Sequence, residues 1–109
     1  MRIIGMFDQR GNSIVGQMEL IGQTIDLVFW PREKKSEFSP DYDIYKKSFV
    51  VGSAWRRKTL DTERNYLSVK FDDPTFITPI FARLLDKDAD GKYALVWQRP
   101  KGKAALSAF

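Results

Sequence analysis

The 109-residue chain contains neither cysteine nor histidine. It therefore cannot form a disulfide or use a thiol nucleophile, and it lacks the ligands on which most zinc and other transition-metal sites depend. It also lacks the side chain that most often acts as a general base in enzymes. A chain without cysteine suits a reducing compartment, and we expect this protein to be cytoplasmic.

Long apolar segments are missing as well. No run approaches the roughly 20 consecutive apolar residues that a membrane helix needs. The first residues, Met1 to Asp8, have neither the apolar centre nor the cleavage pattern of a signal peptide. We therefore expect no association with a membrane.

The residues that are present have the composition of a folded domain. Hydrophobic residues make up 43% of the chain and aromatic residues 14%, which is enough to bury a core. We expect a single β domain over residues 1–100, followed by a flexible basic tail over residues 101–109. The 18 lysines and arginines exceed the 14 aspartates and glutamates, and the net charge of +4 allows attraction to nucleic acid or to an acidic protein.

Apolar and polar side chains alternate along much of the chain, which predicts short β-strands. The pattern is clearest from Tyr66 to Phe71, where Leu67, Val69 and Phe71 are expected to face inward. The expected strands are a short apolar run at 3–7 and the segments 14–21, 24–30, 42–45, 49–58, 66–71, 80–85 and 93–99. Separated by turn residues, they predict a mainly β fold, a single antiparallel barrel or sandwich of about seven to eight short strands.

Two segments need a separate interpretation. Residues 79–86 contain Ile80, Ala82 and Leu84 with a period of two, but the same segment also fits a short helix, and strand is the favoured alternative. In segment 49–58, the small residues Gly52 and Ala54 occupy one face of the expected strand. This arrangement predicts close packing there, or a neighbouring backbone that passes nearby.

Paired carboxylates are the only groups that suggest catalysis or a divalent cation. They are Asp41 with Asp43, Asp72 with Asp73, and the set Asp86, Asp88 and Asp90. The last set resembles the start of a calcium loop but has Trp97 where the bidentate glutamate would be needed. Because aspartate is common in turns, turn formation is the favoured explanation. We expect no enzyme activity, no cofactor and no metal, although a cation at the paired aspartates stays open.

Aromatic and basic residues occur close together, as in small β-barrels that bind single-stranded nucleic acid. An outward row of Arg56, Lys58, Tyr66, Ser68 and Lys70 is the part expected to carry function. The long polar loop over residues 31–41 would add further cations. The candidate binding residues are Lys34, Lys35, Trp55, Arg56, Arg57, Lys58, Tyr66 and Lys70. The alternative is that the tryptophans, including Trp30 and Trp97, only anchor the core.

Several short motifs together resemble a known bacterial family, the one catalogued as domain of unknown function 736. The resemblance covers nearly the whole chain up to Pro100 and leaves the tail outside it. The motifs are Gly5-x-Phe7, Glu33-Lys34-Lys35-Ser36, Pro40-Asp41-Tyr42, Gly52-x-Ala54-Trp55, Tyr66-Leu67-Ser68-Val69-Lys70-x-Asp72-Asp73-Pro74, Pro79-Ile80 and Leu95-Val96-Trp97.

The resemblance implies a small single-domain protein of proteobacteria, often encoded near conjugative plasmids and other mobile elements. It provides no established catalytic residue. We therefore consider two functions. The first is a non-catalytic accessory protein of mobile genetic elements that binds single-stranded DNA or RNA. The second is a protein-binding inhibitor of a host defence complex, with an anti-CRISPR or anti-restriction role. An enzyme that uses the paired aspartates is the weakest alternative.

Overall fold

The computed structural model describes residues 1–60, 64–88 and 90–99. These residues form eight strands, and none of them is in a helix long and apolar enough to cross a membrane. The predicted tail over residues 101–109 lies outside the described residues. The strands are β1 (Arg2–Arg10), β2 (Ser13–Leu20), β3 (Gln23–Pro31), β4 (Tyr42–Lys46), β5 (Phe49–Lys58), β6 (Asn65–Phe71), β7 (Ile80–Leu85) and β8 (Tyr93–Trp97).

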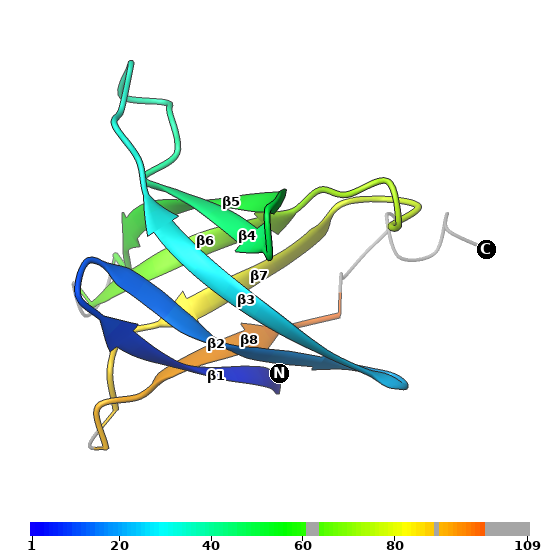
Figure 1. Ribbon diagram of the computed structural model, residues 1–109. Helices are drawn as coiled ribbons and strands as arrows, with labels where there is room; N and C mark the ends of the chain where they lie inside the picture. The colour runs from blue at the N-terminus through cyan, green and yellow to red at the C-terminus, as the bar shows by residue number, and fades with distance from the viewer. Residues whose placement is uncertain (61–63, 89, 100–109) are drawn as a thin grey trace.

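Each strand pairs antiparallel with the next one along the chain, and β8 pairs with β1 (Figure 1). This last pairing closes the sheet into a barrel and decides between the barrel and the sandwich that the sequence left open. Closure gives every strand two neighbours, so no strand presents an unpaired edge. The segment with the ambiguous pattern is strand β7, as favoured, and it lies between β6 and β8.

The inward-facing side chains of the strands form one apolar core. At its centre the rings of Phe7 on β1 and Phe29 on β3 meet edge to face, with 5.3 Å between centroids and 78° between planes. On β6 the buried residues are Leu67, Val69 and Phe71, which confirms the predicted alternation of that strand.

Gly52 on β5 is a point where two strands approach each other closely. A Cβ atom built on Gly52 would lie 2.3 Å from the carbonyl oxygen of Lys70 on β6. The predicted close approach of a neighbouring backbone is therefore confirmed. The pairing of β4 with β5 shifts beside it, because Ile44 pairs with Gly52 while Tyr45 pairs with Val50. The extra residue of this bulge increases the local bend of the strand.

The two ends of the barrel differ. We call the end where β8 begins, at Tyr93, the mouth end, and the opposite end, at Trp97, the far end. The loop between β3 and β4 projects from the barrel at the mouth end (Figure 1). It corresponds to the long polar segment of the sequence, and the backbone N–H of Arg32 donates to the carbonyl of Asp41 across its base at 3.0 Å.

Candidate nucleic-acid interface and barrel mouth

The strand register divides the candidate residues between two faces of the barrel. Ala54 is buried and faces inward, so Arg56 and Lys58 occupy inward-facing positions at the end of β5. Tyr66, Ser68 and Lys70 occupy outward-facing positions of β6, because Leu67 and Val69 are buried. The predicted single outward row is therefore wrong. Its β5 members should have been Trp55 and Arg57, which pair with Ser68 and Tyr66.

The outer face of β5, β6 and β7 is the first candidate surface, and we call it the outer face. Its middle row runs from Trp55 through Ser68 to Arg83, and its row nearest the mouth runs from Arg57 through Tyr66 to Leu85. The third row contains Ser53, Lys70 and Phe81.

Arg83 is the residue of this surface that the sequence analysis missed. Its guanidinium carbon lies 5.2 Å from the centroid of the Tyr66 ring, within the range of a cation–π contact. The signal was present in the sequence, since Arg83 stands between the inward residues Ala82 and Leu84 of the predicted strand. The three rows contain Arg57, Lys70 and Arg83 as cations and no carboxylate.

Trp55 has a structural contact in addition to its place on the outer face. Its indole N–H donates to the carbonyl of Phe38 at 3.0 Å, and this bond ties the loop between β3 and β4 to β5. Trp55 is half-buried, whereas Trp30, at the other side of the loop, is 57% exposed. Trp97 is half-buried against the core at the far end. The tryptophans therefore do not all act as core anchors.

The two lysines of the loop have different surroundings. The Nζ atom of Lys34 lies 3.5 Å from a carboxylate oxygen of Asp41, and Lys35 is exposed. The other oxygen of Asp41 accepts a hydrogen bond of 2.8 Å from the backbone N–H of Arg56. Asp41 thus links the loop to the end of β5, and part of the charge of Lys34 is neutralised within the protein.

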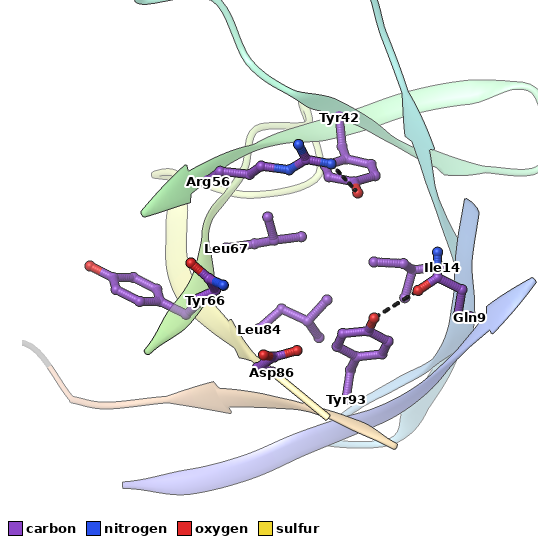
Figure 2. Close-up of a pocket in the computed structure, with 10 residues that line it drawn as sticks. Gln9, Ile14, Tyr42, Arg56, Tyr66, Leu67, Leu84, Asp86 and Tyr93 are labelled. Carbon is purple, nitrogen blue, oxygen red and sulfur yellow. Dashed lines mark hydrogen bonds between the residues drawn. The ribbon is translucent and has the colours of Figure 1, made fainter. Parts of the chain in front are cut away.

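A pocket of about 430 Å³ opens inside the barrel at the mouth end (Figure 2). Its floor is apolar and consists of Ile14, Leu67 and Leu84, which are buried core residues. Its wall and rim are polar and aromatic. They are formed by Gln9, Tyr42, Arg56, Asn65, Tyr66, Asp86 and Tyr93.

Arg56 and Tyr42 form one side of this mouth pocket. The guanidinium of Arg56 lies 5.7 Å from the centroid of the Tyr42 ring and donates a hydrogen bond of 3.3 Å to its hydroxyl. The hydrogen bond to Tyr42 is the main reason that the pKa of Arg56 is raised, and the charge of Asp41 adds to it. Arg56 is therefore a permanent cation at the opening.

Tyr93 and Asp86 form the other side of the mouth pocket. The Tyr93 hydroxyl donates to the side-chain oxygen of Gln9 at 2.8 Å, and the amide nitrogen of Gln9 donates to the carbonyl of Gly11 at 3.0 Å. Burial raises the pKa of Tyr93, and the negative charge of Asp86 raises it further. The phenol is therefore neutral at physiological pH and is held in a defined orientation.

The sequence analysis did not identify the mouth pocket. Two of its aromatic members, Tyr42 and Tyr93, are the first residues of strands that lie on opposite sides of the ring of eight. Large amphipathic side chains at inward positions of strand ends are typical of a pocket at the mouth of a barrel. The pocket could not be predicted from them, however, because the barrel and its strand register were not known from the sequence.

Among the paired aspartates, Asp73 and Asp88 make turn contacts, whereas Asp43 pairs with Arg32 at 3.1 Å and Asp72 with Lys70 at 3.9 Å. Asp73 accepts a hydrogen bond of 3.0 Å from the backbone N–H of Thr75, and hydrogen bonds from Thr75 lower the pKa of Asp73. Asp88 accepts bonds of 2.9 and 3.0 Å from the backbone of Asp90 and Lys92. Among the described residues, no three acidic side chains form a group that could hold a metal ion.

The comparison with known proteins identifies the family. The family model described as "Protein of unknown function (DUF736)" matches residues 3–100. No curated protein and no solved structure matches the chain. The chain therefore belongs to the DUF736 family, as the resemblance of its motifs indicated.

Proposed function

We propose that this member of the DUF736 family binds single-stranded nucleic acid on the outer face of β5, β6 and β7. The observation that carries the proposal is the contact between Tyr66 and Arg83, 5.2 Å from guanidinium to ring centroid, on a surface whose other cations are Arg57 and Lys70. An aromatic ring can stack on an unpaired base, while the cations neutralise phosphates along the strand.

The closed barrel also supports this mode of binding. Because every strand has two neighbours, a partner cannot add a strand to an open edge of the sheet. Recognition then depends on side chains that project from the barrel surface. The face combines aromatic rings with three cations, of which Lys70 lies 3.9 Å from a carboxylate oxygen of Asp72. Such a face favours a polyanion with exposed planar groups, and a single strand has both properties.

The biological role that we propose is that of a non-catalytic, cytoplasmic accessory protein of mobile genetic elements. No carboxylate occupies the outward positions of the proposed surface, so the residues offered for binding do not include an acid–base pair. The partner in this role is a single strand of DNA or RNA that is exposed while genetic material is transferred or defended.

The test is binding of a short oligothymidylate, followed by fluorescence anisotropy at several salt concentrations. We expect binding that weakens as salt rises. Binding releases the counterions condensed on the phosphates, and this release becomes less favourable at higher salt concentration. Tyr66→Ala should weaken binding about 5- to 150-fold, since stacking contributes roughly 1–3 kcal/mol per base.

The matched control is Phe49→Ala, which removes a 68% exposed aromatic side chain at the far end of β5. It should leave the affinity unchanged. Absence of binding at low salt, or equal losses in the Tyr66 and Phe49 variants, would contradict the proposal.

An apolar hollow at the far end favours a second candidate, a protein-binding inhibitor of a host defence complex such as one for restriction or CRISPR. The hollow has a volume of about 430 Å³ and is lined in part by Ile4, Ile21 and Phe76. Ile21 is 94% exposed, and large exposed apolar groups are typical of protein interfaces. A defined protein complex that is recovered with the wild type, resists nuclease and is lost with Ile21→Lys would favour this second function.

A further inference from the structure

The mouth pocket and the outer face are connected by a third hollow, a cleft of about 480 Å³ along the rim. Asn65, Tyr66 and Asp86 line both the mouth pocket and this rim cleft. Arg83 lines the cleft as well and belongs to the outer face through its contact with Tyr66. A strand lying on the outer face therefore has a continuous path over the rim to the mouth.

The rim cleft has the charge that a phosphate backbone requires. Its basic residues are Arg64, Arg83, Lys87 and Lys92, and its acidic residues are Asp86 and Asp88. Lys92 is already paired with Asp8 at 2.6 Å, and Lys87 lies over the Tyr93 ring at 5.8 Å. Arg83 is itself a member of the outer face, and with four cations against two carboxylates positive charge predominates along the path.

The mouth pocket itself suits a planar group with a polar edge. Its floor of Ile14, Leu67 and Leu84 is apolar, and the phenol rings of Tyr42 and Tyr93 stand on opposite sides of the ring of strands (Figure 2). A volume of about 430 Å³ lies within the range of sites that hold small organic ligands. In enzymes that flip a base, the base enters a pocket of this kind and is recognised through hydrogen bonds to its edge.

The polar groups of the pocket include an acceptor and a donor that a base could meet. Asp86 is an acceptor and Arg56 a donor, and the two belong to opposite sides of the opening, beside Tyr93 and Tyr42 respectively. Of the common bases, guanine alone presents two adjacent N–H donors, N1–H and N2–H, which match one carboxylate. It also presents O6 and N7 as acceptors, which match arginine.

We propose that the mouth pocket receives one guanine base of the bound strand, with Asp86 accepting from N1–H and N2–H and Arg56 donating to the acceptor edge. The inference rests on the proposed binding of single strands and adds to it a preferred base. The ordered phenols of Tyr42 and Tyr93 contact the ring of the base, and the rim cleft holds the phosphates on either side of it.

The experiment compares an oligothymidylate with the same oligomer that carries one central guanine or one central inosine. Inosine has the N1–H of guanine but lacks its N2 amino group. We expect the guanine oligomer to bind the wild type about 5- to 150-fold more tightly than the thymidylate, the range for a bidentate contact. The inosine oligomer should retain only part of this advantage.

The decisive variant is Asp86→Asn, which replaces an acceptor by a group that also donates at an exposed position. It should abolish the preference for guanine over inosine while the thymidylate binds as before or more tightly. Asp90→Asn is the matched control, because it removes the same charge from an exposed residue of the same turn. It should keep the preference.

The outcomes separate the two proposals. Thymidylate binding without a guanine advantage, or an advantage that persists in Asp86→Asn, would overturn the guanine site and leave the outer-face function standing. If no oligomer binds but guanosine monophosphate binds in a manner that depends on Asp86, the binding of single strands is overturned. The ligand of the mouth pocket is then a free nucleotide and not a base of a bound strand. If neither the oligomers nor guanosine monophosphate binds, both proposals are overturned.

Discussion

Arg83 and Tyr66 are diagonal neighbours on adjacent strands, with the guanidinium 5.2 Å from the centroid of the phenol ring. The contact gives the outer face an aromatic surface and a cation in one defined arrangement. Arginine can stack on a ring and donate to phosphate at the same time, which lysine cannot do as well. The two properties of this residue can therefore be separated by substitution.

Arg83→Ala should weaken the binding of an oligothymidylate and reduce the slope of log affinity against log salt by about 0.7, the value for one phosphate on a single strand. Arg83→Lys should also weaken binding but should leave the slope unchanged, because it keeps the charge and loses the planar contact. Anisotropy titrations at four or more salt concentrations measure both quantities. Arg2→Ala, which removes a cation at the far end, should change neither, and an equal slope in Arg83→Ala and wild type would contradict the contact with phosphate.

Gly52→Ala should destabilise the barrel by about 1–3 kcal/mol, the usual cost of inserting a methyl group into a packed site. The new Cβ would lie 2.3 Å from the carbonyl oxygen of Lys70, so β5 and β6 would have to separate. Urea unfolding followed by tryptophan fluorescence gives the difference in free energy. Ser53→Ala, at the next and half-buried position, should change stability by less than about 0.5 kcal/mol. Equal stability of Gly52→Ala and wild type would show that the strands can separate at no cost.

Trp55→Phe should increase the rate at which trypsin cleaves after Lys34 and Lys35. The substitution keeps a ring at this position but removes the hydrogen bond of 3.0 Å to the carbonyl of Phe38. The loss of about 1 kcal/mol corresponds to a roughly fivefold larger population of open loop. Mass spectrometry of the first cleavage products measures the rate. Trp30→Phe changes an exposed tryptophan beside the same loop and should not alter the rate.

Tyr93 should contribute to the loss of stability at alkaline pH. Its pKa is raised in the folded protein above the ordinary value of 10.0, because burial and the charge of Asp86 disfavour the phenolate. The unfolded state then loses its proton first, so the contribution is fully present below pH 10.0 and declines as the pH rises through the folded pKa. Unfolding free energies of wild type and Tyr93→Phe between neutral and alkaline pH test this. The wild type should lose more stability than the variant, and parallel profiles would contradict the raised pKa.

The strands were predictable because their signal is local. Alternation of apolar and polar residues, with an apolar run for β1, indicated the strands of the barrel, including β7, where a helix was the alternative. The Asp73 turn was predictable for the same reason, since an aspartate can bond to backbone two residues away. The motifs up to Pro100 likewise indicated the family that the match over residues 3–100 shows.

The faces of β5 and β6 were only partly predictable. The inward positions of Gly52 and Ala54 were visible in the sequence, and counting two further residues would have placed Arg56 inside and Arg57 outside. The prediction instead treated basic residues of the run Arg56-Arg57-Lys58 as parts of one outward surface and did not apply the alternation to them. The partner of Tyr66 was not predictable, because Arg83 reaches it only through the pairing of β6 with β7.

The sequence by itself therefore determined which segments are strands, the inward side chains of β6, and which chemistry is excluded by the absence of cysteine and histidine. The tertiary structure decided that β1 pairs with β8, and with it that the sheet is a closed barrel with a mouth. Strand formation depends on neighbours in the chain, whereas closure depends on contacts between its first and last strands. Tyr42, Arg56, Asp86 and Tyr93, which are far apart in sequence, meet around one pocket for this reason.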